Sequence, residues 1–166
     1  MKSRLVPLVL ALLLLPLSLS AQNGTWTAVA SSGDIDETSL GLFAVQGPLL
    51  FHAPGAVGNV VARYNVTNTF GGGVSDFPGW NTLELGYFDA AAGTQVTATL
   101  FQVNPCTGAS VIVCVVTSVD NAAPACATCM FGGGAFNFGN FLYFVEVTVQ
   151  RAAAAQNVSA RTLRIF

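Results

Sequence analysis

The sequence is short of charge, and above all of lysine. Aspartate, glutamate, lysine and arginine make up 8% of the chain, whereas they make up about 25% of an ordinary globular protein. Lys2 is the only lysine, and after residue 21 four arginines stand against eight acidic residues, which leaves residues 22–166 with a net charge of −4. Nucleic-acid binding needs clustered lysine and arginine to neutralise phosphates. The composition therefore excludes nucleic acid as an expected partner.

The low charge also leaves the surface without its usual solvating groups. Because 52% of the residues are hydrophobic, a folded monomer would expose an unusually neutral surface. Either threonine, serine, asparagine and glutamine solvate that surface, or copies of the chain or an extracellular matrix cover it. Our first functional hypothesis is therefore a structural or adhesive protein that associates with itself or with a cell-surface or matrix partner.

The residues needed for nucleophilic catalysis are missing. His52 is the only histidine, it ends a short apolar run, and no Gly-x-Ser-x-Gly segment occurs, so a Ser-His-acid arrangement is hard to assemble. Two carboxylates could still serve a glycosidase, and Glu84 and Glu146 are the pair to test because both fall on predicted strands. Solvent-facing positions on a sheet explain both residues more simply. The sequence thus predicts a protein that is not an enzyme.

Candidate metal ligands are equally sparse. Asp34, Asp36 and Glu37 lie close together in one loop, and calcium prefers several carboxylate and carbonyl oxygens from such a loop. The segment lacks the twelve-residue calcium-loop pattern with its closing glutamate. Helix capping or simple solvation of the loop accounts for these acids, so we expect no metal and no cofactor.

The N-terminal segment has the three parts of an export signal. Lys2 and Arg4 form a basic region, Leu5–Leu17 is apolar, and Ser18–Ala21 supplies small residues for cleavage. The apolar run is shorter than the roughly 20 residues that a membrane span needs, and two prolines interrupt it. The sequence predicts a signal peptide at 1–21 and a secreted, periplasmic or cell-surface protein that has no membrane span after cleavage.

No segment has the period of a long amphipathic helix, whereas apolar and polar residues alternate along much of the chain. The alternation is clearest in Phe138–Gln150, which is typical of a central strand that needs a partner on each edge. Nine segments in all are typical of strands: Thr25–Ala30, Leu40–Val45, Leu49–His52, Asn59–Phe70, Trp80–Phe88, Gln95–Val103, Val111–Val116, Phe138–Gln150 and Val158–Phe166. They predict one all-β domain at 22–166, an antiparallel sandwich of the jelly-roll or immunoglobulin-like kind.

Two segments carry more specific predictions about that sandwich. Val111–Val116 is apolar on both sides of the pleat, which is typical of a strand in the middle of a sheet. Asn121–Gly134 is rich in alanine, proline, cysteine and glycine, and we expect it to be the longest irregular segment.

Four cysteines in an exported chain predict two disulfides. Cys106 with Cys114 would flank a turn, leaving Cys126 with Cys129 in a short loop. The main rival pairs Cys114 with Cys126 and Cys106 with Cys129, and a third pairing is also possible. Cys126-Ala-Thr-Cys129 fits the redox pattern Cys-x-x-Cys, but the glycines that follow cannot begin the helix that would lower the pKa of the first thiol. We therefore expect structural bridges.

An aromatic group supplies the alternative functional hypothesis. Phe77, Trp80 and Tyr87 surround the Pro78–Gly79 turn, and aromatic side chains at a loop are one way in which β-sandwiches bind sugars. A tryptophan beside a turn can instead close the end of the core. The alternative to a structural role is a secreted carbohydrate-binding module that uses these three residues.

Overall fold

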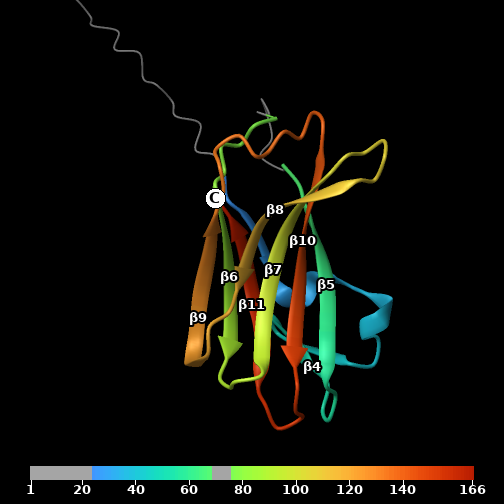
Figure 1. Ribbon diagram of the computed structural model, residues 1–166, viewed down its shortest axis with the longest axis vertical. Helices are drawn as coiled ribbons and strands as arrows, with labels where there is room; N and C mark the ends of the chain where they lie inside the picture. The colour runs from blue at the N-terminus through green and yellow to red at the C-terminus, as the bar shows by residue number, and fades with distance from the viewer. Residues whose placement is uncertain (1–23, 69–75) are drawn as a thin grey trace, which may run out of the picture.

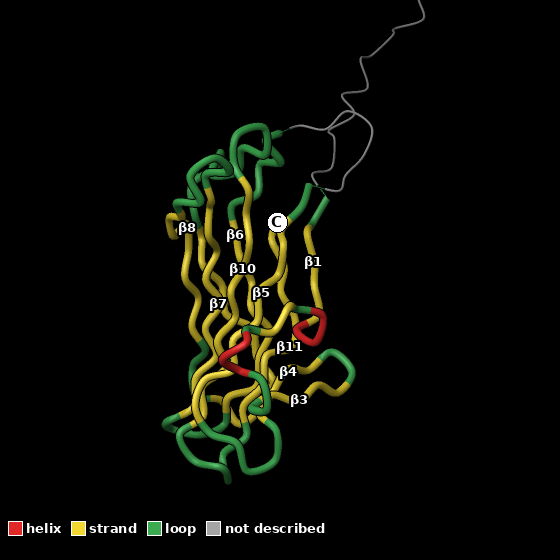
Figure 2. The backbone as a smooth tube through the Cα atoms, turned by 90° about the vertical axis from the view of Figure 1, so that its right-hand side faces the viewer, coloured by secondary structure: helices red, strands yellow, loops and turns green. Residues whose placement is uncertain are grey.

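The computed structural model describes residues 24–68 and 76–166. The predicted signal peptide lies outside the described residues, as do positions 69 and 70 at the end of one predicted strand. The described chain forms two antiparallel β-sheets that pack face to face (Figures 1 and 2). Its strands are β1 (Trp26–Val29), β2 (Asp34–Ile35), β3 (Phe43–Gln46), β4 (Leu49–His52), β5 (Gly58–Val66), β6 (Thr82–Asp89), β7 (Thr94–Val103), β8 (Ser110–Thr117), β9 (Asn121–Met130), β10 (Leu142–Arg151) and β11 (Val158–Ile165). The prediction of an all-β sandwich is confirmed, but the described chain has eleven strands in place of the nine expected.

Helical structure is confined to two short 3₁₀ turns in the described chain. These are η1 (Ala30–Ser32) and η2 (Glu37–Ser39), each three residues long. Within residues 24–68 and 76–166, no helix has the length and hydropathy needed to cross a membrane.

Strand β11 organises the six-stranded sheet, whose order is β3-β4-β11-β6-β9, with β1 also paired to β11. β6 pairs with one edge of β11. The other edge is shared, because β4 pairs with Ser159 and Ala160 while β1 pairs with the stretch from Thr162 to Ile165. Arg161 lies where the register with β6 shifts, so it is the extra residue of a β-bulge.

Strand β10 has the corresponding place in the five-stranded sheet, whose order is β2-β5-β10-β7-β8. It pairs with β5 along one edge and with β7 along the other. Its inward side chains are all buried: Tyr143, Val145, Val147 and Val149. They belong to one hydrophobic core together with Ala160, Leu163 and Ile165 of β11 in the facing sheet. The alternation predicted for this central strand is confirmed.

Two predictions about single segments are wrong. The segment Asn121–Gly134, expected to be irregular, contains β9, which pairs with β6 and forms an edge of the six-stranded sheet. Its inward positions hold the small side chains of Ala125, Ala127 and Cys129; alanine is a weak strand former, so pairing with β6 decides the conformation. Val111–Val116, expected in mid-sheet, lies in β8, an edge of the five-stranded sheet, and its partner among the described strands is β7.

Aromatic rings close one end of the core. Trp80, in the segment before β6, packs edge-on against Phe136 and Phe138, with ring centroids 5.1 and 6.0 Å away. The ring of Tyr143 lies 4.5 Å from that of Phe136. Its hydroxyl group bonds the backbone of two loop residues, at 2.8 and 3.0 Å. These contacts hold the glycine-rich segment before β10 against the core.

A buried histidine and a buried arginine hold the turn between β4 and β5. The carbonyl of Gly58 accepts a hydrogen bond from Nε2 of His52 at 3.0 Å, and Nδ1 is left buried with no partner among the described residues. Arg151 donates to the carbonyls of Ala53 and Ala56, at 3.0 and 2.8 Å. Burial lowers the pKa of His52, the bond to Gly58 opposes that shift, and the charge of Arg151 adds to it. His52 is therefore neutral at pH 7 and has a structural role.

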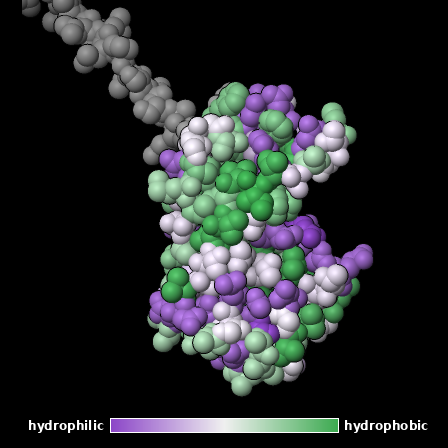
Figure 3. All heavy atoms as spheres, viewed as in Figure 1, coloured by the Kyte–Doolittle hydropathy of each residue, from purple (hydrophilic) through white to green (hydrophobic). Residues whose placement is uncertain are grey.

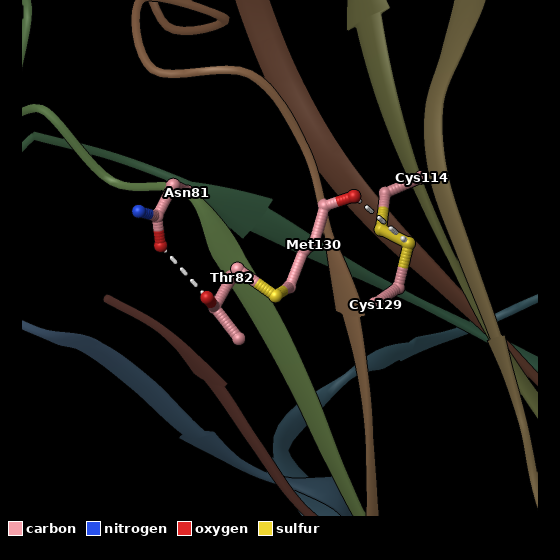
Figure 4. The surroundings of a disulfide bond; sticks show 5 residues. All are labelled: Asn81, Thr82, Cys114, Cys129 and Met130. Carbon is pink, nitrogen blue, oxygen red and sulfur yellow. Dashed lines mark hydrogen bonds between the residues drawn. A yellow bond between two sulfur atoms is a disulfide. The ribbon is translucent and has the colours of Figure 1, made fainter.

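One disulfide joins the two sheets along their shared side. Cys114 of β8 is bonded to Cys129 of β9, with Cα atoms 6.1 Å apart (Figure 4). This bond belongs to the third possible pairing, so the two arrangements named from the sequence are wrong, and so is the prediction of a second disulfide. Cys106, in the β7–β8 turn, and Cys126, on β9, are exposed free thiols. At about 3.3 Å per residue they lie in opposite directions from the bridge, roughly 20 Å apart, so they cannot pair within the chain.

Replacing both Cys114 and Cys129 with alanine is expected to lower the free energy of unfolding by about 3 kcal/mol, because the bridge spans a sequence separation of 15 residues. The midpoint of thermal unfolding should fall by roughly 10 °C, as followed by circular dichroism. The matched control is the double alanine variant of Cys106 and Cys126, which should melt like the original protein. Equal unfolding midpoints for both variants would show that the Cys114–Cys129 bond does not stabilise the contact between β8 and β9.

Replacing His52 with glutamine is expected to remove part of the pH dependence of stability. Because the pKa of His52 lies below its ordinary value of 6.5 in the folded protein, the unfolded chain binds more protons, and the free energy of unfolding falls as the pH drops below about 6.5. Glutamine keeps a donor for Gly58 and does not titrate, so the variant loses that slope. Urea unfolding between about pH 5 and pH 8 measures it, and equal slopes would contradict the assignment.

Candidate functional site

The three aromatic residues predicted to bind a ligand do not form one exposed group. Trp80 and Tyr87 are 1% and 3% exposed, whereas Phe77 is 55% exposed. The indole of Trp80 donates to the carbonyl of Gly24 at 2.6 Å, and the hydroxyl of Tyr87 accepts from the backbone of Val119 at 3.2 Å. The expected platform is therefore corrected: Trp80 closes the end of the core, and its polar edge is satisfied inside the protein.

The two carboxylates considered for a glycosidase lie on opposite sides of the sandwich. Glu84 projects from β6 on the outer face of the six-stranded sheet and pairs with Arg164 at 3.2 Å. Glu146 projects from β10 on the outer face of the five-stranded sheet and pairs with Arg63 at 2.8 Å. The hydrophobic core separates them, so they cannot face one another across a cleft.

The acidic loop near the N-terminus is used for capping and ion pairing. Asp36 accepts hydrogen bonds from the backbone and hydroxyl of Thr38, at 3.0 and 2.6 Å, and lies 2.6 Å from Arg63. These bonds, those from Thr38 above all, lower the pKa of Asp36 to about 2. Asp34 and Glu37 are exposed. Across the described ranges, no group of three or more histidine, cysteine, aspartate or glutamate side chains is placed to hold a metal ion.

One carboxylate lies inside the protein. Asp89, at the end of β6, is 1% exposed and accepts hydrogen bonds from the hydroxyl groups of Ser118, at 2.5 Å, and Thr94. Each oxygen thus has a donor, and the bonds tie β6 to the start of β7 and to the segment after β8. Asp89 is a structural anchor.

Apolar side chains gather on the outer face of the five-stranded sheet. Phe101 of β7 and Phe144 of β10 are register partners whose rings stack with centroids 4.8 Å apart. Ile112 of β8 is the partner of Phe101 on its other side and is 60% exposed. Figure 3 shows hydrophobic residues concentrated in the upper half of this view. We call the outward set the apolar face: Phe101, Val103, Ile112, Val115, Leu142 and Phe144.

Strand β8 is the free edge of the apolar face. It contains eight residues with no charge and no proline, and within residues 24–68 and 76–166 its ladder bonds are to β7 alone. Edge strands are usually protected by lysine, proline, a bulge or short length. β8 has a bulge at Val113 but none of the other devices, whereas β9 contains Pro124, and β2 and β3 are two and four residues long. β8 is therefore the edge most open to a further strand.

The outer face of the six-stranded sheet has a groove instead. Ser159 of β11 is the register partner of both Phe51 on β4 and Phe88 on β6. Neighbouring strands are about 4.8 Å apart, so the two phenylalanines stand about 10 Å apart with a small serine between them. Leu49 and Pro124 also line the resulting hollow, whose volume is about 350 Å³.

The sequence signals for these two surfaces are weak for different reasons. The apolar run Val111–Val116 is a signal for the apolar face, but the same run is also typical of a central strand. The groove has no local signal, because Phe51, Ser159 and Phe88 are far apart in the sequence and become neighbours only through strand register.

Comparison with known proteins adds no family. No protein-family model matches the chain, and no curated protein is similar to it. One similar solved structure belongs to a study of the promiscuous specificity of carbohydrate-binding modules of the β-sandwich superfamily, with a TM-score of 0.42, 10% identity, and coverage of 86% of this chain and 54% of that chain. Another is an exo-β-1,3-galactanase from Phanerochaete chrysosporium with galactose, with a TM-score of 0.41, 13% identity, and coverage of 86% and 29%. The chain spans about half of the first structure and under a third of the second, and at these TM-scores the similarities carry no argument.

Proposed function

We propose that the protein is a non-catalytic structural module that associates with copies of itself through β8 and the apolar face. The observation that carries this proposal is the free, uncharged edge of β8. Such an edge presents unpaired backbone N–H and C=O groups, which pair readily with another strand. Beside it, Ile112 and Val115 expose 60% and 47% of their surfaces, and covering them removes apolar surface from water.

Antiparallel pairing of β8 with β8 of a second copy uses this edge on both partners. The pairing is self-complementary about a two-fold axis, as in most homodimers. No charged side chain of β8 would meet its own copy, so no like-charge repulsion opposes the contact. The two five-stranded sheets would become one sheet, and the two apolar faces would lie side by side across the axis.

The disulfide and the predicted signal peptide support a role outside the cytoplasm. The disulfide between Cys114 and Cys129 is the kind of bond that persists in oxidising compartments, in keeping with the predicted signal peptide. A non-catalytic role is inferred because His52 is a structural residue and because Glu84 and Glu146 lie on opposite faces. We assign the module to an assembly at or outside the cell surface.

Placing lysines on the edge is the test of self-association. In the double variant Ile112→Lys and Val115→Lys, two copies would bring like charges together at the edge, so we expect a monomer. The original protein should show a mass that rises with concentration in sedimentation or light-scattering experiments. Amide hydrogen exchange of β8 should also slow as the original protein is concentrated, because its free N–H groups become bonded.

The control is Gln150→Lys, which adds a charge to an exposed position of β10 on the same outer face, outside the apolar face. It should associate like the original protein. A monomer for the original protein at all concentrations would refute the proposal, and so would lysine variants that assemble unchanged. Association without protection of the β8 amides would show that another surface is used.

A further inference from the structure

Arg161 is the arginine of the described chain whose side chain has neither an acidic nor a carbonyl partner. Arg63 and Arg164 account for the cations of the ion pairs found there, and Arg151 is bonded to backbone carbonyls. Within residues 24–68 and 76–166, Arg161 has neither an ion pair nor a hydrogen bond from its side chain. Arg161 is the extra residue of the β11 bulge, and a bulge can redirect a side chain relative to its neighbours in the strand. Its side chain lines the groove beside Phe88.

Two further hollows lie along β11 beyond the first one. A second hollow of about 280 Å³ lies between Arg161 and Gly86, and a third of about 350 Å³ lies beside Thr162 and Arg164. Gly86 gives room to Thr162, because a Cβ atom at position 86 would clash with the Thr162 hydroxyl oxygen. From Val158 to Arg164 the strand rises about 20 Å, which suits an extended ligand better than a compact one.

The lining near the start of the groove combines apolar rings with neutral polar groups. Phe51 and Phe88 offer apolar surface on either side of Ser159, and the C–H faces of a sugar ring pack on such surfaces. The hydroxyl of Ser159 and the side-chain amides of Gln46 and Asn157, which line the same hollow, can donate to and accept from sugar hydroxyl groups. This part of the groove suits an uncharged, hydroxyl-rich ring.

The unpaired guanidinium group of Arg161 favours a ligand that carries a negative charge. A guanidinium group binds a carboxylate through two parallel hydrogen bonds, and this bond is stronger than one between neutral groups. We propose that the groove binds an acidic polysaccharide through its uronate units, with a ring beside Phe51 and Phe88 and a carboxylate on Arg161. This inference concerns the face opposite to the apolar face and goes beyond the proposed self-association.

Other anionic polymers fit the groove less well. Nucleic acids and heavily sulfated polysaccharides carry closely spaced charges and need several cations, whereas Arg164 is already paired with Glu84 and residues 22–166 carry a net charge of −4. A neutral sugar would leave Arg161 without a partner. A peptide carboxyl terminus would occupy Arg161 but would supply no hydroxyl groups for Ser159.

The test is calorimetric titration of the folded protein with trigalacturonate, alongside the same trisaccharide after reduction of its carboxylates to hydroxymethyl groups. We expect the acid form to bind and the reduced form to bind at least about tenfold more weakly. Arg161→Gln should weaken binding of the acid form by a similar factor and leave the reduced form unchanged. Arg161→Lys, which keeps the charge without the paired bonds, should fall between the two.

Two further variants separate the groove from general charge effects. Arg63→Gln removes the same charge from the outer face of the other sheet and should bind trigalacturonate like the original protein. Ser159→Leu fills the gap between the rings and should abolish binding of both trisaccharides, with circular dichroism as the check on folding. The proposal is overturned if trigalacturonate does not bind at concentrations up to about 10 mM, if binding does not depend on Arg161, or if a sulfated oligosaccharide or a peptide carboxyl terminus binds more tightly.

Because the proposed self-association and the proposed ligand binding use different faces, failure of one can be told apart from failure of the other. Binding to trigalacturonate should be the same in the Ile112 and Val115 lysine variant as in the original protein. Loss of binding in that variant would overturn the assignment of the groove as a site independent of self-association.

Discussion

The packing of β10 against β11 is the interaction on which the rest of the structure depends. Each strand is central in its own sheet, with partners along both edges, and the inward side chains of both are buried in one core. The hydrophobic effect drives this contact without prescribing direction, and the pleat makes it orderly, because every second residue must face the partner sheet. The core constrains only the inward residues, so the outward residues of the same strands can differ between the two sheets.

The outer faces of the two sheets carry different kinds of side chains. On the five-stranded sheet, stacked phenylalanines and the aliphatic residues of an edge strand leave apolar surface in contact with water. On the six-stranded sheet, a serine set between two phenylalanines makes a hollow, and a bulge brings an arginine to it. A protein that joins copies of itself through the first face and binds an acidic polymer through the second would cross-link that polymer.

The scarcity of charge makes the place of each arginine informative. Arg63 is held by Asp36 and Glu146, and Arg164 by Glu84. Arg151 is buried and satisfied by carbonyl groups. The carbonyl partners of Arg151 are accounted for by the fold itself, because leaving a buried cation unpaired would be costly. Arg161 stands apart because it has no such explanation in the described chain, and for that reason it defines the candidate ligand site.

The shared side of the two sheets shows how the fold manages its edges. β8 and β9 are both edge strands, each belonging to a different sheet, and the Cys114–Cys129 bond holds them together. The bond restrains the opening of the sandwich on this side but adds no backbone pairing, so β8 keeps its free edge. Closure of the core and exposure of the strand edge are thus compatible.

The sequence alone determined the fold class and the inner faces of the long strands. Alternation of apolar and polar residues is a local property, and the alternation predicted in Phe138–Gln150 matches the burial of Tyr143, Val145, Val147 and Val149. The lack of charge pointed to an exposed neutral surface, and the prominence of apolar residues in β8 was visible as well. These features depend on the chain itself, not on which strand lies beside it.

Tertiary structure decided everything that depends on strand order and register. An apolar run such as Val111–Val116 looks the same in mid-sheet and at an edge, because periodicity does not reveal the neighbour. β9 is a strand despite its alanine content because its backbone pairs with β6. The pairing of Cys114 with Cys129, the burial of Trp80 and the row of Phe51, Ser159 and Phe88 each join residues from separate segments. Local sequence carries no distance between such segments, so only the assembled sheets could bring them together.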